Sequence, residues 1–163
     1  TDTTPGILRC YDTELFVQTI KEARANADYV VAVVHWGTEH TTVLEDVQRS
    51  SAREYIDAGA DVIIGGHSHC LQGIEYYEDK PIFYSLGNFC FGGNSTPSDT
   101  DSMIVQQTFT FNKKGKLTKS SKLNIIPCSI SSSSGYNDYC PVPLTGDAKQ
   151  RVLDKISQYS EGL

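Results

Sequence analysis

Three of the four histidines in this sequence stand where they could bind a metal ion. His67 and His69 follow an apolar run at residues 61–64, within the segment Gly-Gly-His-Ser-His. His35 follows a second apolar run, at residues 29–34. Runs of this kind are typical of buried strands, and α/β proteins build their sites at the carboxyl ends of such strands. The pattern therefore predicts a functional site at one end of a sheet.

Metal coordination is the chemistry that these side chains suit best. A ligating imidazole presents a neutral nitrogen about 2.0–2.1 Å from the ion, and a strand end fixes the backbone that carries it. Side chains alternate along an extended segment, so His67 and His69 should lie on one side and could each serve one ion of a binuclear pair. Alone, His-Ser-His is more often a pair of turn histidines. An equivalent position for His35 on a second strand favours a metal site.

A hydrolytic site with two metal ions normally also needs carboxylate ligands. Asp61 precedes its strand and Asp57 lies in a predicted helix, so neither is well placed. Three imidazoles cannot neutralise two divalent ions, and the sequence therefore holds only part of such a ligand set. No Gly-x-Ser-x-Gly or P-loop motif is present, which leaves serine hydrolase and nucleotide kinase chemistry without support.

Four further residues could support the metal ligands or bind substrate, although no catalytic residue can be assigned. Glu39 could bind metal or act as a base, and it could equally be a solvated loop carboxylate. His40 lies in the same polar loop and is expected to be exposed. Trp36 is expected to be a packing wall rather than a platform for substrate. Asn88 follows a glycine and is either a turn residue or an amide that faces the site.

Two helices frame the predicted strands. Asp12 is expected to cap a helix over residues 13–27. Thr42 and Glu45 have the spacing of a capping box, which would start a second helix that ends at Gly59. The residues expected to face the sheet are Leu15, Phe16, Thr19, Ile20 and Ala23 in the first helix, and Val47, Ala52, Tyr55 and Ile56 in the second.

A strand, a helix and a strand with short loops predict a βαβ unit. Its two strands should be parallel, with a right-handed crossover. Both strands are apolar throughout, so both are expected to be buried on two faces. His35 and His67 would then converge if the two strands are neighbours in the sheet.

The second half of the chain is expected to form an antiparallel hairpin. Residues 103–111 alternate as a half-buried strand does, and residues 117–127 supply the return strand after a turn. Three lysines near the turn, Lys113, Lys114 and Lys116, suggest a solvated tip. The other elements expected in this half are a strand over residues 80–89, loops over 92–101 and 129–143, and a helix capped by Thr145 that runs to about residue 159.

Length and charge limit the class of protein and its partners. A chain of 163 residues suits one domain, here residues 1–163, and it contains no apolar run of the roughly 20 residues that a membrane helix needs. The formal net charge is −6 and cationic residues form no dense patch, so nucleic acid is excluded as an expected partner. A polyanionic ligand would also be repelled unless a metal, or Arg49 and Arg53, offset the charge.

The five cysteines leave two alternatives open. No Cys-x-x-Cys pair occurs, which excludes a zinc knuckle or a thioredoxin-type motif. Cys128 and Cys140 bracket a serine-rich loop and could form a disulfide in an oxidising compartment, or all the cysteines could be separate thiols. The full set is Cys10, Cys70, Cys90, Cys128 and Cys140.

The residues around the histidines resemble a known family. Residues 34–39 (Val-His-Trp-Gly-Thr-Glu) resemble the VHWGxE motif of the bacterial CapA family of capsule synthesis, which includes poly-γ-glutamate biosynthesis proteins. Residues 57–65, residues 70–75 and residues 80–89 resemble further motifs of that family in the same order. The resemblance runs from about Tyr29 to Phe91.

This resemblance implies a calcineurin-like metallophosphoesterase fold, a four-layer α/β/β/α sandwich with a binuclear metal site. In that pattern His35 and His67 would share one ion and His69 would bind the other. The ions would be divalent, such as Mn, Zn or Fe. They would activate a bridging hydroxide for attack on phosphorus.

The same resemblance implies that this chain is the carboxyl-terminal half of the fold. The amino-terminal segments of the superfamily that carry Asp-x-His, Gly-Asp and Gly-Asn-His have no counterpart in this chain, so the missing half is an expected partner. Alone, the chain is expected to be a soluble piece that is inactive, holds metal poorly and exposes apolar surface. Copies of it could cover that surface by self-association.

Two functions follow from the resemblance. The first is a metal-dependent hydrolase of phosphoesterase type, complete only in the longer protein. The second is a non-enzymatic component of capsule synthesis or export that binds polyglutamate or a membrane partner. Family members generally act at the cell surface with a membrane anchor, and this location is expected for the longer protein.

Overall fold

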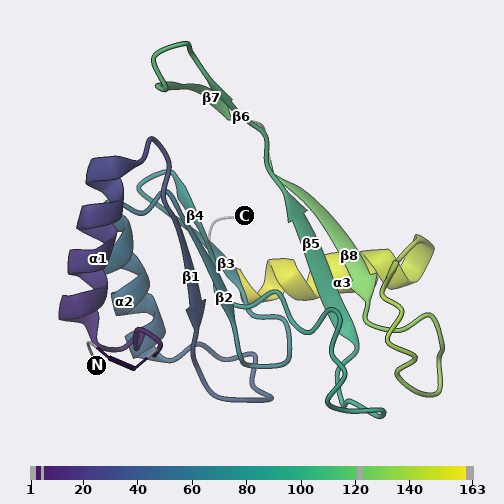
Figure 1. Ribbon diagram of the computed structural model, residues 1–163. Helices are drawn as coiled ribbons and strands as arrows, with labels where there is room; N and C mark the ends of the chain where they lie inside the picture. Colours follow the sequence, from purple (N-terminus) through teal and green to yellow (C-terminus); the bar gives the residue numbers. More distant parts are fainter. Residues whose placement is uncertain (1–2, 5, 121–122, 161–163) are drawn as a thin grey trace.

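The computed structural model describes residues 3–4, 6–120 and 123–160. This part of the chain has mixed α/β structure, as the sequence predicts (Figure 1). The helices are α1 (Thr13–Asn26), α2 (Asp46–Asp57) and α3 (Gly146–Tyr159). The strands are β1 (Val31–His35), β2 (Val62–Gly66), β3 (Ile74–Tyr77), β4 (Lys80–Phe83), β5 (Asp101–Gln106), β6 (Phe109–Phe111), β7 (Leu117–Ser120), β8 (Asn124–Ser129) and β9 (Val142–Pro143). Within the described residues, no helix is long and apolar enough to cross a membrane.

The predicted βαβ unit is present. A four-stranded sheet has the order β1-β2-β4-β3, and β1 and β2 are parallel neighbours. Their register places His35 opposite Gly66, so both strands end at the same edge of the sheet. Helices α1 and α2 cover one face of this sheet, and Phe16, Tyr55 and Ile63 belong to the core between them (Figure 1).

The prediction that both strands are buried on two faces is correct for β2 and wrong for β1. Strand β1 is at the edge of the sheet, and its side chains alternate between buried and exposed. Ala32 and Val34 face the helices, whereas Val33 is 70% exposed. An apolar run therefore indicates a strand here without indicating whether both of its faces are covered.

The helices have nearly the predicted bounds, but their caps differ. Asp12 and Thr145 occupy N-cap positions without a side-chain hydrogen bond to the helix. The capping box is formed by Glu45 and Gln48, three residues after the predicted pair of Thr42 and Glu45. Gln48 completes the capping box because its buried side-chain amide accepts a hydrogen bond from the Glu45 N–H and is held in place by donating another to Gln72 Oε1. Three residues predicted to face the sheet are exposed: Leu15, Thr19 and Val47.

A short hairpin in the first sheet was not predicted. Strands β3 and β4 pair antiparallel across Glu78 and Asp79, which both have positive φ. Two acidic residues are an unusual sequence for a tight turn, where glycine and asparagine are the common signals. Strand β4 ends at Phe83 rather than at residue 89, because the chain then leaves the sheet to form a bridge between Leu86 and Leu71.

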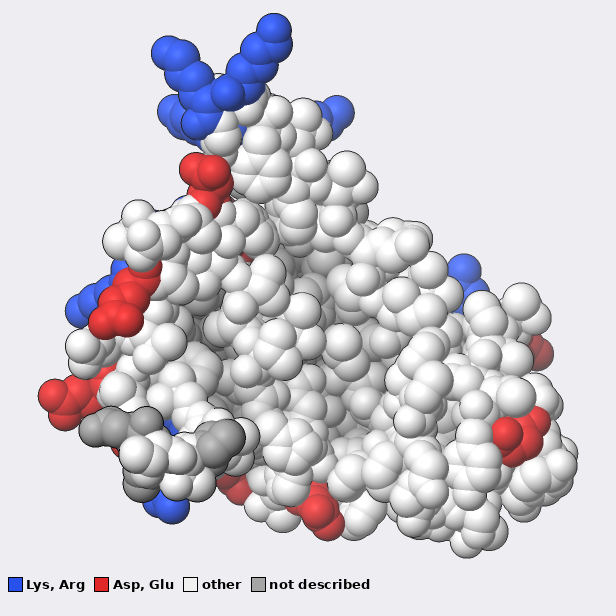
Figure 2. Space-filling model, in the orientation of Figure 1, with Lys and Arg blue, Asp and Glu red and all other residues white. Residues whose placement is uncertain are grey.

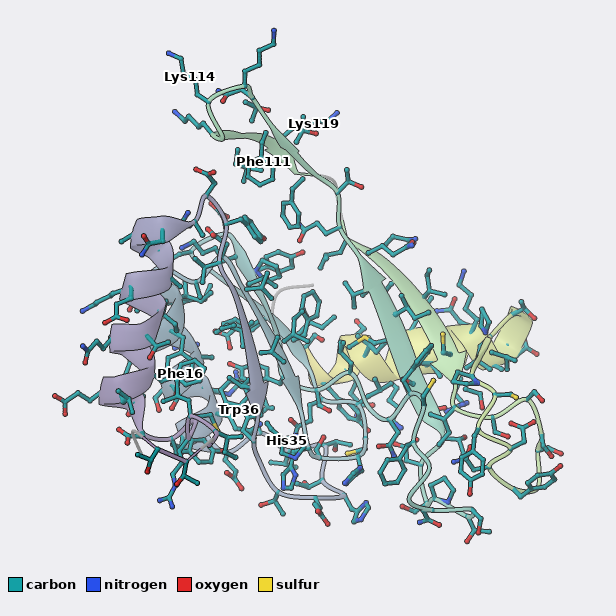
Figure 3. All side chains as sticks on the ribbon, viewed as in Figure 1. Phe16, His35, Trp36, Phe111, Lys114 and Lys119 are labelled. Atoms are coloured by element: carbon teal, nitrogen blue, oxygen red, sulfur yellow. The ribbon has the colours of Figure 1, made fainter. Side chains whose placement is uncertain are left out.

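The predicted antiparallel hairpin is confirmed, in two parts. Strands β5 and β8 pair over their whole length, and β6 and β7 continue as a separate ribbon that projects from the body (Figure 1). Phe109 of this ribbon contacts Tyr29, with ring centroids 4.4 Å apart. Its tip carries exposed lysines that point away from the body (Figures 2 and 3).

A second sheet has the order β5-β8-β9, and helix α3 packs against it. Val152 and Ile156 of α3 pack with Val62, Phe83 and Met103 in a second core cluster, which joins the two sheets. The segment predicted as a loop over residues 129–143 ends in β9, which pairs with β8. All five cysteines are free thiols, so the structure has the separate thiols rather than the alternative disulfide.

Candidate metal centre

His35 and His67 are in direct contact, as the convergence of two adjacent strand ends requires. His35 is the last residue of β1, and His67 directly follows β2. The His35 Nε2 and His67 Nδ1 atoms are 2.8 Å apart, and the ring centroids are 4.5 Å apart. Figure 3 shows His35 at the lower end of the sheet, opposite the lysine-bearing ribbon. We call the ends of β1 and β2 with His35, His67 and His69 the histidine rim.

The backbone of the histidine rim is bent and is not the extended segment that the sequence predicts. His67 has φ +105° and His69 has φ +57°, and residues other than glycine seldom adopt positive φ values of this kind. The ring centroids of these two residues are 6.2 Å apart. Such conformations each cost on the order of 1–3 kcal/mol and are often retained at functional sites. The two side chains thus converge through backbone strain rather than through strand alternation.

Asn88 faces the site and orients His69. The Asn88 side chain is buried, and its Nδ2 donates to the backbone oxygen of His69. This bond sets the orientation of the amide, so Oδ1 is the atom 2.8 Å from His69 Nδ1. Since an amide oxygen can only accept, His69 Nδ1 carries the proton and Nε2 keeps a free lone pair. Of the two interpretations of Asn88, the structure has the amide that faces the site.

Glu39 and His40 lie beside the histidine rim but are largely exposed. Glu39 Oε1 is 3.9 Å from His69 Nε2, and Glu39 Oε2 is 3.9 Å from His40 Nε2. These separations exceed hydrogen-bond length. The His40 ring stacks on His69 at 5.7 Å between centroids, and the His40 backbone N–H donates to Ser68. His40 is therefore exposed, as predicted, yet it is held against the site.

Trp36 is a packing wall, as predicted. Its indole is 2% exposed, stacks on Tyr84 and donates from Nε1 to the Tyr84 backbone oxygen at 2.9 Å. Gly65 is needed next to it, because a Cβ at that position would lie 2.1 Å from the same oxygen. Packing of Trp36 thus fixes the backbone directly after His35.

The electrostatic surroundings favour a neutral His35. Burial lowers the pKa of His35, and the neighbouring His67 and His69 lower it further, while Glu39 acts in the opposite direction. A neutral imidazole is the form that binds a metal ion. The lowered pKa of His35 thus favours its metal-binding form.

The donor set fits one side of a metal ion. Two imidazole nitrogens on a tetrahedral ion lie about 3.3 Å apart, so the 2.8 Å pair of His35 and His67 would have to separate by about 0.5 Å, and both rings would have to turn, to accept an ion in place of a proton. His69 has the hydrogen bond to Nδ1 that ligating histidines usually make. Within the described residues, however, no three His, Cys, Asp or Glu side chains come together closely enough to hold an ion.

Two cavities adjoin the histidine rim, and the sequence revealed the lining of neither. A pocket of about 210 Å³ lies beside His69 and is walled by the loop of residues 89–99, including Phe91 and Asp99. A groove of about 920 Å³ lies on the other side, between residues 7–12 and β1. Residues 89–99 have only the composition of a polar loop, so no signal in the sequence pointed to a site wall.

The fold and the histidine rim define a mixed α/β protein that gathers imidazoles at the ends of adjacent parallel strands. More specifically, the chain belongs to the family of bacterial capsule synthesis proteins called PGA_cap, whose profile matches residues 1–93. The family resemblance noted in the sequence is thereby confirmed.

Two relatives match over nearly the whole chain. The PGA biosynthesis protein CapA of Bacillus subtilis is 46% identical over 151 residues, which cover 92% of this chain and 36% of the relative. The capsule biosynthesis protein CapA of Bacillus anthracis is 34% identical over 160 residues, or 96% of this chain and 34% of the relative. Similarity thus extends beyond Phe91, where the motif resemblance ended. The chain spans about a third of the length of these relatives.

Proposed function

We propose that this chain forms part of a capsule or poly-γ-glutamate biosynthesis protein whose histidine rim binds divalent metal ions for a hydrolase reaction of phosphoesterase type. The observation that carries the proposal is the contact between His35 and His67 at the ends of two parallel strands. The names of the relatives, which refer to PGA and capsule biosynthesis, support the biological role. The longer protein would act at the cell surface.

The residues of this chain would have distinct tasks in that reaction. His35 and His67 would hold one ion and His69 would hold a second, with Asn88 keeping His69 in the tautomer that presents Nε2. Bound ions would polarise a phosphoryl oxygen and lower the pKa of a water molecule. Glu39, 3.9 Å from His69 Nε2, lies where a carboxylate could accept a proton or bind metal. Trp36 would fix the strand end from behind.

The remaining metal ligands would come from another part of the longer protein. The open edge of β1, with Val33 70% exposed and Ile7 93% exposed, borders the groove next to His35 and His67. A further part of the protein that pairs with the free edge of β1 and packs on its exposed face would cover these apolar side chains and bring its own residues to the histidine rim. A second copy of this chain is the alternative occupant, and the mass of the longer protein in solution distinguishes the two.

Metal content tests the metal proposal. The longer protein, dialysed against Mn²⁺ or Zn²⁺ and then against buffer, should retain metal, and His67→Ala should weaken retention by about 100-fold. Glu22→Ala, on the exposed side of α1, is the control for non-specific binding and should retain metal like the parent protein. Equal metal content in the parent protein and His67→Ala would overturn the proposal.

A non-enzymatic role in polymer binding or export is the second candidate. The observation in its favour is that the described residues contain no complete ligand group for an ion. Hydrolysis of p-nitrophenyl phosphate by the metal-loaded longer protein, abolished in His69→Ala, would favour the hydrolase. Binding of poly-γ-glutamate without hydrolysis of any phosphoester, and unchanged in His69→Ala, would favour the second role.

A further inference from the structure

We propose that Asn137 is a positioning residue for the candidate metal centre, and that it fixes the loop of residues 89–99 so that Phe91 forms a rigid wall against His69. The proposal rests on the proposed function in one respect, namely that His69 takes part in the site. It assigns a task to a residue that lies outside the part of the chain matched by the family profile.

The contact to be explained is that between Phe91 and His69. Their ring centroids are 4.9 Å apart, and both residues line the 210 Å³ pocket. Phe91 lies in an irregular loop that has no strand or helix between residues 84 and 100. A loop of this kind keeps an aromatic ring in one place only if other parts of the protein hold its backbone.

Asn137 provides that hold. Its Nδ2 donates to the backbone oxygens of Phe91 and Asn94, both at 3.0 Å, and its backbone N–H donates to the Ser95 oxygen at 2.7 Å. Its Oδ1 accepts from the Tyr139 N–H. The side chain is 1% exposed, so each of these bonds is shielded from water. One asparagine thus binds the loop of residues 89–99, which we call the wall loop, at Phe91, Asn94 and Ser95.

The segment that carries Asn137 is itself held in place. The Asp138 carboxylate accepts hydrogen bonds from the Ser132 and Cys140 N–H groups and from the hydroxyls of Ser131 and Ser132. These bonds lower the pKa of Asp138 to about 2. The serine-rich segment over residues 131–140 is therefore a fixed support and not a free loop.

The far end of the wall loop is tied to α3. Lys155 Nζ is 2.7 Å from Asp99 Oδ2 and 3.1 Å from Asp101 Oδ2. Asp99 also accepts from the Asp101 N–H. With Asn137 at one end and Lys155 at the other, the carboxyl-terminal part of the chain sets the shape of the pocket at His69.

Histidine-selective NMR on metal-free protein tests the proposal. The ring current of Phe91 displaces the His69 ring-proton signals, and Phe91→Leu, which removes this ring current, gives the scale of the displacement. Asn137→Ala should shift the His69 signals by most of that amount and leave those of His35 and His67 in place. Asn137→Asp should do the same, because it keeps the acceptor for Tyr139 but replaces the Nδ2 donor with an oxygen that repels the carbonyls.

Ser134→Ala is the matched control, since Ser134 is exposed in the same segment, and it should leave His69 unchanged. Unchanged His69 signals in folded Asn137 variants would overturn the proposal, and so would an equal displacement of all the histidines. If an Asn137 variant unfolds, the test is made on the parent protein instead. Scalar couplings across the hydrogen bonds from Asn137 Nδ2 to Phe91 and Asn94 should then be measurable, and their absence would overturn the proposal. A failure of metal binding leaves these spectra unaffected, so the two proposals can fail separately.

Discussion

The two sides of the candidate site are built in different ways. The histidine rim is held by the register of two parallel strands, in which His35 lies opposite Gly66. The wall loop with Phe91 has no such register and is held by side-chain bonds from residues more than forty positions away. Backbone pairing fixes the ligands, and polar tethers fix the surface that a substrate would meet. The two sides should therefore respond to different mutations.

The largest effect should come from the core beneath the histidine rim. Ile63, the second residue of β2, is fully buried against the helices. Ile63→Ala should lower the free energy of unfolding by about 3 kcal/mol, because it removes buried methyl groups and leaves a cavity. Urea unfolding followed by circular dichroism measures this loss.

Glu22→Ala on the exposed side of α1 is the control, and it should stay within about 0.5 kcal/mol of the parent protein. An equal loss for both variants would contradict the place of Ile63 in the core. In the longer protein Val33→Ala should cost more than this control, because we propose that another part of the protein packs on the exposed face of β1.

The tether at the far end of the wall should have the next largest effect. Asp101 is buried and accepts from Arg151 at 2.7 Å and from Lys155 at 3.1 Å. Asp101→Asn should cost about 2 kcal/mol of stability, because charge-assisted hydrogen bonds are lost while the Arg151 side chain remains partly solvated. Asp154→Asn on the exposed side of α3 should change stability by less than about 0.5 kcal/mol.

The same carboxylate predicts how stability depends on pH. Burial acts to raise the pKa of Asp101, but the hydrogen bonds from Arg151 and Lys155 outweigh it and the pKa is lowered. A carboxyl group with a lowered pKa contributes stability above its unfolded value of about 3.9, and this contribution is lost as the pH falls through the folded value. As the pH is lowered below about 4, the urea concentration at the unfolding midpoint should thus decrease more steeply for the parent protein than for Asp101→Asn. Parallel pH curves for the two proteins would contradict this assignment.

The sequence predicted the histidine rim better than the wall, for a physical reason. Strands β1 and β2 are continuous apolar runs joined by an amphipathic helix, and local patterns of this kind are sufficient to place His35 and His67. The positive φ values of His67 and His69 could not be predicted, because they result from tertiary contacts. The tethers from Asn137 and Lys155 join irregular segments that are distant in the sequence, where no periodicity exists to indicate which residues meet.

Asn88 directly precedes the wall loop and bonds to His69, and its removal should have a smaller and more local effect. Asn88→Ala should cost about 1 kcal/mol, because it removes the hydrogen bonds with His69. His69 should then lose its preference for a proton on Nδ1, since the bond at one ring nitrogen sets the tautomer. Nitrogen-15 chemical shifts of the His69 ring measure the change. A parent protein with the proton on Nε2 would contradict the orientation described for Asn88.

The smallest effect should be that of a reducing agent, and it tests whether the wall is held only by non-covalent bonds. All five cysteines are free thiols. Cys128 is buried, and Cys140, in the segment that carries Asn137, is exposed. A reducing agent should therefore change the free energy of unfolding by less than about 0.5 kcal/mol.

Alkylation mapped by mass spectrometry gives the corresponding order of reactivity. Exposed Cys90 and Cys140 should react first in the native protein, and buried Cys70 and Cys128 only on unfolding, since burial also raises the pKa of both buried thiols. In denaturant without reductant, all of these cysteines should be labelled. If Cys128 and Cys140 alone resist labelling, a disulfide holds the segment of Asn137, and the wall of the pocket is fixed covalently as well as by the tethers described above.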